Sequence, residues 1–406
     1  MQVLRIIASM DPASGGPCQG IRNIIPELER EGIHNEVVSL DDPLSTFIGG
    51  DPFNIVALGP AKGPWNYSEK LVPWLLDNLH RFDVVIVHGL WLYHGYAVKK
   101  SLSLIKKKAV NFNSLPRLFV MPHGMLDPYF QRASERRLKA LRNWVYWKFI
   151  ENKIINNADG LLFTCEAELR LARQPFHPYH PKQEINIGYG VQSPPAYELI
   201  KTNGFFEKCP QVRDQPFLLF LSRIHEKKGV DHLVEAYEQV ISQCAIEKIN
   251  FQAIPKLVIA GPGLESAFGQ KMQQKVAQSP LLGENVFFPG MLSGDAKWAA
   301  FYACEAFILP SHQENFGIAV VEAMACGKPV LISNQVNIWT EIIEAGAGLA
   351  ADDSTKGVKQ LLNSWQCLDR EEKIRMGLRA LDCFKKDFTI RAAGKRFTDL
   401  VVTQIR

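Results

Sequence analysis

The chain has 406 residues, of which 47% are hydrophobic and 22% are charged. These fractions are typical of a soluble globular protein and exclude a disordered, collagen-like or disulfide-scaffolded chain. At roughly 150 residues per domain, the length predicts two or three domains. The net charge of +4 does not indicate a nucleic-acid partner.

The excess positive charge lies in one segment. Residues 97–153 carry 13 basic and 3 acidic residues, whereas residues 191–406 carry 24 of each. The run R-R-L-K-A-L-R-N-W-V-Y-W-K-F favours an amphipathic helix with a solvated basic face and an aromatic core face. The alternative is a surface that docks on anionic lipid or on a pyrophosphate-linked acceptor.

Cysteine usage and the terminal sequence indicate the compartment. Eight scattered cysteines without a C-x-x-C pair predict free thiols in a reducing environment. The N-terminal apolar run is too short for a signal peptide, and no run approaches the ~20 residues of a membrane-spanning helix. We expect a cytoplasmic protein that can still touch the inner face of the membrane.

Short apolar runs recur along the chain, each followed by a longer helical pattern. The expected strands are 3–8, 35–40, 84–87, 118–121, 161–165 and 185–187, and then 217–221, 257–260, 286–288, 306–309 and 330–332. Apolar strands that alternate with helices indicate parallel sheets covered on both faces. The proline- and glycine-rich stretch 191–216 is interpreted as an interdomain linker.

This pattern predicts an α/β chain of two doubly wound, Rossmann-like domains, 1–190 and 191–385. A C-terminal helix within 386–406 is expected to cross back to the first domain. Ligands of such sheets bind beyond the carboxyl ends of the strands. Two domains that face each other would form an interdomain cleft, and the motifs below all follow strand ends.

Two motifs of the first half could contact a ligand. In D-P-A-S-G-G-P, Gly15 and Gly16 would bring backbone N–H groups to an anion at a helix start, although a simple tight turn fits equally well. In V-M-P-H-G-M-L, His123 ends a strand. A histidine there contacts ligands in some proteins and is more often structural.

Two motifs of the second half place charges at strand ends. In S-R-I-H-E-K-K-G, Arg223 and Lys228 suit a diphosphate that gains negative charge as it leaves, or they are solvated surface cations. Glu314 lies just before the N-terminus of a short apolar helix, and Glu322 lies inside it. Such carboxylates need partners, which sugar and ribose hydroxyls, a helix cap or a salt bridge would provide.

Several motifs are absent from the sequence. There is no D-x-D metal–diphosphate clamp and no P-loop, and Ser266 stands where a dinucleotide fingerprint has its third glycine. His177 and His180 form at most a weak metal pair. We therefore expect no metal and no cofactor, and neither a P-loop kinase nor a dehydrogenase.

Together, these motifs resemble those of the retaining nucleotide-sugar glycosyltransferases of GT-B fold, in the family (family four, group 1) that includes many bacterial polysaccharide and lipid glycosyltransferases. The resemblance covers essentially the whole chain. Its most specific part is the E-x7-E element of Glu314 and Glu322, followed by A-M-A-C-G-K-P-V. One departure lies at 187–192, where I-G-Y-G-V-Q replaces the family's usual I-P-N-G-V-D.

The resemblance implies a role for each motif. Arg223 and Lys228 would neutralise the donor diphosphate. Glu314 would accept hydrogen bonds from the donor sugar, and Glu322 would hold the ribose. His123 would face the transferred sugar and the acceptor. The other implied donor contacts, to phosphate, sugar and base, come from Gly15, Gly16, Met291, Asn315, Phe316 and Gly317.

The implied activity is metal-independent, retaining transfer of a hexose to a glycan or lipid-linked saccharide acceptor in polysaccharide biosynthesis. UDP-glucose or a related UDP-hexose is the favoured donor, and GDP-mannose is its chief rival. An epimerase or phosphorylase of similar fold and a non-catalytic nucleotide-sugar-binding protein remain as alternatives.

Overall fold

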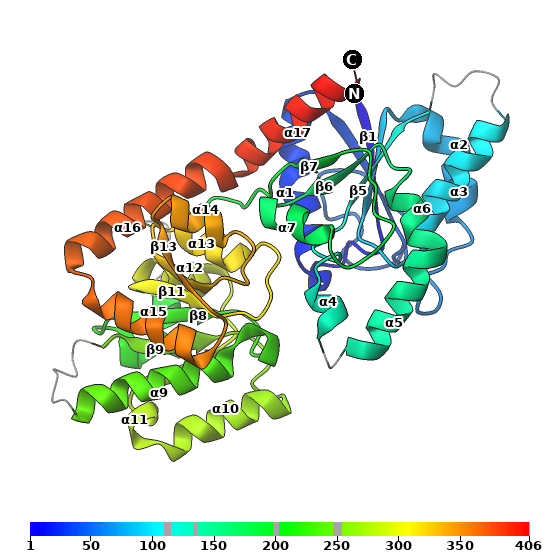
Figure 1. Ribbon diagram of the computed structural model, residues 1–406. Coiled ribbons are helices and arrows are strands. Elements are labelled where there is room, and N and C mark those ends of the chain that lie inside the picture. Colours follow the sequence, from blue (N-terminus) through cyan, green and yellow to red (C-terminus); the bar gives the residue numbers. More distant parts are fainter. Residues whose placement is uncertain (109–114, 134–135, 198–202, 247–253, 406) are drawn as a thin grey trace. The chain divides into compact units, whose positions relative to one another are not determined.

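The computed structural model describes residues 1–108, 115–133, 136–197, 203–246 and 254–405 (Figure 1). The chain divides into two compact units. The first comprises Met1–Gly190 and Ile390–Arg406, and the second comprises Val191–Thr389. Within the described residues, no helix combines the length and the apolarity needed to cross a membrane.

The first unit is built on a parallel seven-stranded sheet with the order β3-β2-β1-β4-β5-β6-β7. Its strands are β1 (Gln2–Ile7), β2 (His34–Ser39), β3 (Ile55–Ala57), β4 (Val84–His88), β5 (Arg117–Met121), β6 (Gly160–Phe163) and β7 (Glu184–Asn186). Its helices are α1 (Gly16–Arg30), α2 (Leu71–Asn78), α3 (Tyr93–Lys108), α4 (Tyr129–Arg132), α5 (Arg137–Tyr146), α6 (Asn152–Ile155), α7 (Glu166–Ala172) and α17 (Ile390–Ile405), with short turns η1 (Pro12–Ser14) and η2 (Leu79–Arg81) and a π-helix η5 (Trp147–Glu151).

Both faces of this sheet are covered, which explains why its central strands are mostly apolar. Val85 and Val87 of β4 belong to a core that includes residues of α2 and α3. Val84 and Ile86 face the other side, where Phe397 of α17 joins the core. Figure 1 shows α17 beside α1 on that side of the sheet.

The second unit has a parallel six-stranded sheet with the order β10-β9-β8-β11-β12-β13. Its strands are β8 (Phe217–Leu221), β9 (Lys256–Ala260), β10 (Val286–Gly290), β11 (Ala306–Leu309), β12 (Val330–Ser333) and β13 (Gly348–Ala351). Its helices are α8 (Asn203–Lys208), α9 (Val230–Ile246), α10 (Ala267–Gln278), α11 (Pro280–Gly283), α12 (Gly294–Ala303), α13 (Ile318–Ala325), α14 (Trp339–Glu344), α15 (Thr355–Cys367) and α16 (Arg370–Cys383), with short turns η7 (Pro210–Val212) and η8 (Glu226–Lys228) and a π-helix η10 (Phe384–Phe388).

The predicted fold class is confirmed, and each expected strand lies within two residues of an observed one. Two strands were missed. β3 has three half-buried residues at a sheet edge, and β13 reads Gly-Leu-Ala-Ala. Neither offers the run of large apolar residues that marks the other strands.

The stretch 191–216 differs from the expected linker. It belongs to the second unit and carries α8 and η7. Phe205 is fully buried there, with its ring centroid 5.5 Å from that of Phe217 in β8. The linker prediction is therefore wrong for residues 203–212, because one aromatic anchor packs a segment that its prolines and glycines mark as irregular.

Candidate functional site

The strand order of the second sheet reverses between β8 and β11, and loops after these strands meet at such a point. Gly229, after η8, has φ +67°, and a Cβ atom there would lie 2.1 Å from the backbone oxygen of Pro310. Only glycine permits this close approach. The close approach of these two loops places Lys228, which is 8% exposed, in an ion pair with Glu314 in the loop after β11.

The Glu314 backbone is held on both sides. Its N–H donates to the carbonyl of Gln335 at 2.9 Å, and its carbonyl accepts from the N–H of Asn337 at 3.0 Å. Gly317, with φ +78°, then forms the start of α13. These bonds orient the Glu314 carboxylate without using any of its own acceptor capacity.

A second carboxylate–lysine pair lies on α13 and α12. Lys297 Nζ is 2.6 Å from Glu322 Oε1, and the ammonium lies 4.6 Å from the ring centroid of Trp298. Burial raises the pKa of Glu322, and the Lys297 ammonium opposes that shift. The sequence did not single out Lys297, whose only signal is its place in the first turns of a helix after M-L-S-G-D.

A pocket of about 430 Å³ opens beside this pair. It brings together Arg223, Met291 and Lys297, with Gly261 in its wall. A Cβ atom on Gly261 would lie 1.9 Å from the backbone oxygen of Ser222, so glycine lets the ends of β8 and β9 converge. The pocket lining consists of Leu221, Ser222, Arg223, Gly261, Pro262, Met291, Leu292, Ser293, Gly294 and Lys297.

The loop between Glu314 and α13 has a buried phenylalanine at its centre. Phe316 is 5% exposed, and its ring packs edge-on against Phe388 with centroids 5.6 Å apart. Asn315 and Gly317 flank it. The use of the backbone of Asn315–Gly317 in donor contacts stays a prediction.

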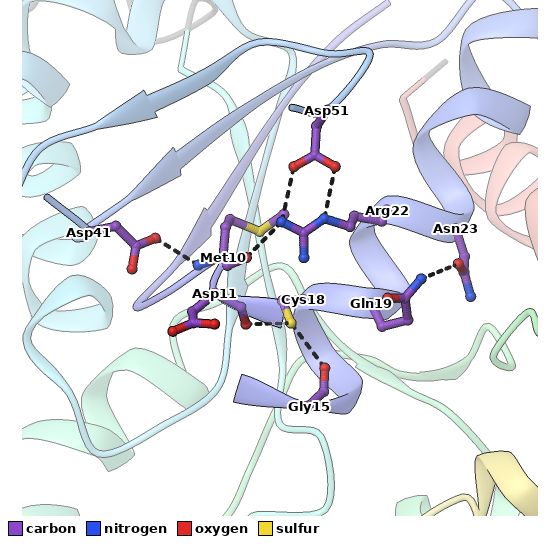
Figure 2. A network of polar contacts seen from close by, with 9 residues as sticks. All are labelled: Met10, Asp11, Gly15, Cys18, Gln19, Arg22, Asn23, Asp41 and Asp51. Atoms are coloured by element: carbon purple, nitrogen blue, oxygen red, sulfur yellow. Dashed lines mark hydrogen bonds and ion pairs between the residues drawn. The ribbon is translucent and has the colours of Figure 1, made fainter. Parts of the chain in front are cut away.

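In the first unit, Gly15 and Gly16 form the turn that starts α1. Figure 2 shows Gly15 near Cys18 at this turn. Gly15 has φ +89°, and no side chain caps the helix from that position. The Arg22 guanidinium pairs with Asp51 at 2.8 Å and donates to the carbonyl of Met10 at 2.7 Å, which fixes the preceding loop. The turn is thus held from behind while its first amides remain suited to an anion.

The loop that departs from the family pattern supports this turn. The Tyr189 hydroxyl donates to the carbonyl of Gly16 at 2.7 Å. A Cβ atom on Gly20 would lie 2.7 Å from the Tyr189 ring, so the helix packs closely on it. Tyr189 therefore gives the altered loop a supporting function at the glycine turn.

His123 follows β5 in a left-handed backbone conformation, with φ +54°. Its Nε2 lies 2.9 Å from Nδ1 of His88, the last residue of β4. The next amide, of Gly124, donates to the buried carboxylate of Glu168 at 2.5 Å. Burial lowers the pKa of His123 to about 3, so its imidazole is neutral at neutral pH.

One group in the described residues has the composition of a metal site. Possible ligand atoms of Asp231, His232 and His312 lie within 4.8 Å of one another. Nδ1 of His312 lies 2.8 Å from Asp353, and Nδ1 of His232 lies 2.7 Å from Thr355. His177 and His180 are not part of this group. The expectation of metal-independent chemistry stays a prediction.

The basic segment places apolar side chains in solvent as well as basic ones. Trp147 is buried, as a core aromatic should be, but the exposed fraction is 53% for Trp144 and 85% for Leu138. We call this region the α5 surface. It comprises exposed Leu138, Leu141, Trp144, Val145 and Phe149, and exposed Arg137, Lys139, Arg142 and Lys148.

Comparison with known proteins gives two family matches. Residues 203–376 match the family described as glycosyl transferases group 1, and residues 15–185 match the glycosyl transferase 4-like domain. Together the matches cover most of the chain, and each lies within one of the two sheet-containing units.

Two curated relatives and one solved structure are informative. The chain is 39% identical over 45% of its length to N,N'-diacetylbacillosaminyl-diphospho-undecaprenol alpha-1,3-N-acetylgalactosaminyltransferase of Campylobacter jejuni, and 27% identical over 46% to O-antigen chain mannosyltransferase C of Escherichia coli. The matches span 43% and 46% of these relatives. Anabaena Alr3699/HepE in complex with UDP-glucose is 16% identical over 99% of this chain and all of its own, with a TM-score of 0.68.

The structural likeness shows the fold alone, and the family matches show the membership of the chain. The matched regions include the glycine turn, His123, the Lys228–Glu314 pair and the Glu322–Lys297 pair. The chain belongs to the group 1 glycosyltransferases of GT-B fold.

Proposed function

We propose that the protein transfers a hexose from a UDP-sugar, with retention of configuration, to a glycan or lipid-linked saccharide in polysaccharide biosynthesis. One observation carries the proposal: two carboxylate–lysine pairs and a pocket lie together at the switch point of the second sheet. Carboxylates suit the hydroxyls of a sugar and a ribose, and cations suit the diphosphate between them.

In this proposal, the pocket holds the nucleoside. Glu322 accepts hydrogen bonds from the ribose hydroxyls, and Lys297 keeps its carboxylate charged. Met291, which is 63% exposed, lies near the base. Arg223 and Lys228 bind the diphosphate, and Glu314 orients the sugar.

The reaction proceeds on one face of the sugar. The bond between the anomeric carbon and the phosphate oxygen breaks, and its electron pair stays with the phosphate. The acceptor oxygen bonds to the same face of the anomeric carbon, and its proton passes to the departing phosphate. Arg223 and Lys228 stabilise the negative charge that develops, the type of effect worth about 10²–10³ in rate per removed donor.

Support for a UDP-sugar comes from the structural neighbour, whose structure is a complex with UDP-glucose. GDP-mannose is the rival donor, since one relative is named as a mannosyltransferase. Thermal-shift measurements with UDP, GDP and their sugars rank these donors, because a ligand that binds the folded state raises Tm. A larger shift with UDP and UDP-glucose supports the proposal, and a larger shift with GDP and GDP-mannose contradicts its choice of donor.

A non-catalytic nucleotide-sugar-binding protein is the competing function. It would bind UDP-glucose as tightly, and would release no UDP with any acceptor. Lys228 beside Glu314 favours the enzyme, because it places a cation at the reacting end of the donor, where negative charge develops on the leaving group.

For the acceptor, we propose a lipid-linked saccharide presented at the inner, cytoplasmic face of an anionic membrane. The relative from Campylobacter jejuni is named for an undecaprenol-linked acceptor. The α5 surface has the chemistry of an interfacial helix, with exposed leucine, tryptophan and phenylalanine beside basic side chains. Such a surface would hold the enzyme on the membrane, close to a lipid-anchored acceptor.

A further inference from the structure

The first strand of the first unit contains a buried arginine. Arg5 in β1 is 3% exposed. Its Nε donates to Oδ1 of Asn35 at 2.9 Å, and the guanidinium carbon lies 5.3 Å from the ring centroid of Phe397 in α17. Burial lowers the pKa of Arg5 to about 10, which leaves it protonated at neutral pH.

The other end of this guanidinium reaches a histidine. Arg5 Nη1 lies 3.4 Å from Nε2 of His88. A guanidinium has donors and no acceptor, so the His88 Nε2 must be the acceptor. Burial, the neighbouring His123 and Arg5 itself hold the pKa of His88 well below its usual value, so the ring is neutral and its one proton lies on Nδ1.

The proton position on His88 determines the hydrogen-bond role of the His123 ring. His88 Nδ1 lies 2.9 Å from Nε2 of His123. Because Nδ1 of His88 is the donor, Nε2 of His123 is the acceptor. The single proton of the neutral His123 ring then lies on its Nδ1.

We propose that Arg5 and His88 are positioning residues that fix His123 in the Nδ1–H tautomer, so that it offers a hydrogen-bond donor to an oxygen of the transferred sugar or the acceptor. This inference rests on the proposed function for the identity of the oxygen. The tautomer itself follows from the three side chains alone.

Other hydrogen bonds hold the backbone that carries the two histidines. His94 Nε2 lies 2.9 Å from the carbonyl of His88. The Glu168 carboxylate accepts from the amide of Gly124 and from the hydroxyl of Thr164 at 2.6 Å. These bonds hold the backbone at the end of β4 and after His123, from which the two rings project.

The arrangement lies at a cavity wall rather than in a closed core. A pocket of about 40 Å³ in the first unit is lined by Arg5, His88, His123 and Tyr189, with α1 and α17 as further walls. Tyr189 is also the residue that supports the glycine turn. Tyr189 thus links the cavity that holds the two histidines to the glycine turn at the start of α1.

Nitrogen-15 NMR of histidine-labelled full-length protein tests the tautomer directly, because ring nitrogens with and without a proton have distinct shifts. His123 signals are assigned by their loss in His123→Gln. We expect the proton on Nδ1 in the wild type and in the control His34→Gln, which alters an exposed histidine. A proton on Nε2 of His123 in the wild type would overturn the inference.

Variants of the chain separate positioning from mere packing. Arg5→Met removes the donor that imposes the tautomer, and is expected to give a mixture at His123. His88→Asn retains an amide donor near the Nδ1 position, whereas His88→Leu does not. The Nδ1–H form should persist in His88→Asn and decrease in His88→Leu. An unchanged tautomer in both Arg5→Met and His88→Leu would contradict the proposal.

Activity provides a second, separate readout. Loss of one positioned donor should lower kcat/KM for transfer by about tenfold in His88→Leu, with most of the loss recovered in His88→Asn and UDP affinity retained in both. Equal losses in the two variants would contradict a role through the tautomer. If the wild type transfers no sugar, the proposed function fails, while the NMR result still decides the tautomer.

Discussion

At Glu322, two opposing effects act on one carboxylate. Burial raises its pKa, and Lys297 lowers it. A ribose-binding carboxylate must accept hydrogen bonds, and the ionised form accepts best. Lys297 therefore matters for the charge state of Glu322 as much as for contact with a ligand.

Lys297→Met should weaken UDP binding, because Glu322 loses the cation that opposes its raised pKa. We expect about a tenfold loss of affinity near pH 7, a free energy typical of a hydrogen bond to a charged group. The loss should shrink as the pH rises and Glu322 ionises. Isothermal titration calorimetry measures it, with the exposed Lys271→Met as the control. Equal, pH-independent affinities of variant and wild type would rule out this role.

Single residues differ in how far the sequence reveals them. Glu314, Glu322 and Lys228 stand at fixed spacings around strand ends and helix starts, so the sequence marks them. Arg5 stands inside a strand that reads as apolar and His88 ends another, and their pairing depends on the register of β1 and β4. Local spacing carries no information on such a cross-strand contact.

At the scale of elements, the π-helix η5 buries an acid. Glu151 is 2% exposed and accepts from the amide of Trp91 at 3.2 Å. Burial raises the pKa of Glu151 to about 8 from an ordinary 4.5. Between these values the folded protein keeps a proton that the unfolded chain has lost, so the free energy of unfolding falls as the pH rises through this window.

Glu151→Gln should remove this dependence while its amide oxygen can still accept from Trp91. We expect the variant and the wild type to be similar near pH 5, and the variant to be more stable by a few kcal/mol, roughly, near pH 8. Urea unfolding across this range measures the difference. A stability difference that does not grow with pH would contradict a buried, protonated Glu151.

The convergence of β8 and β9 depends on Gly261. With φ +142° and no room for a Cβ atom, Gly261→Ala should destabilise the fold by about 3 kcal/mol. Gly283→Ala, whose Cβ would lie 3.8 Å from the nearest atom, is the matched control. Denaturant unfolding compares them. Similar stabilities of the two variants would show that the strand ends do not need this contact.

Elements were predictable where burial makes a strand continuously apolar, as in β4 and β8. β13 was missed because this strand lies at the sheet edge and pairs with β12 alone, where small residues can form a strand. The structure within 191–216 was also missed, because Phe205 holds this segment through a long-range contact that no local sequence pattern indicates. Long-range packing, rather than propensity, decides such segments.

At the scale of the whole molecule, charge is distributed unevenly along the chain. The second unit has a small acidic excess, and the basic excess lies in the first unit around the α5 surface. The sequence favoured the interpretation that its aromatic residues face the core. Trp147 follows that expectation and Trp144 does not, because helix periodicity alone does not say which residues a neighbouring element covers.

The α5 surface should bind vesicles that contain anionic phospholipid, and salt should weaken this binding. Leu141→Glu with Phe149→Glu should abolish vesicle co-sedimentation. The control Ile374→Glu with Leu378→Glu changes two exposed apolar residues of α16. Vesicle binding that does not depend on acidic lipid or salt would contradict membrane docking through this surface. Equal losses of vesicle binding in both double variants would also contradict it.

The central claim is that this chain releases UDP from a UDP-hexose as it transfers the sugar, with Lys228 and Glu314 at the reacting end of the donor. The most direct measurement is UDP release from UDP-glucose and related UDP-hexoses with lipid-linked saccharide acceptors, by the wild type, Lys228→Ala, Glu314→Gln and the control Lys271→Ala. We expect turnover in the wild type and the control, and a loss of at least about 100-fold in the two site variants, with their Tm values close to that of the wild type. Undiminished UDP release by Lys228→Ala and Glu314→Gln, or release of GDP from GDP-mannose alone, would contradict the account.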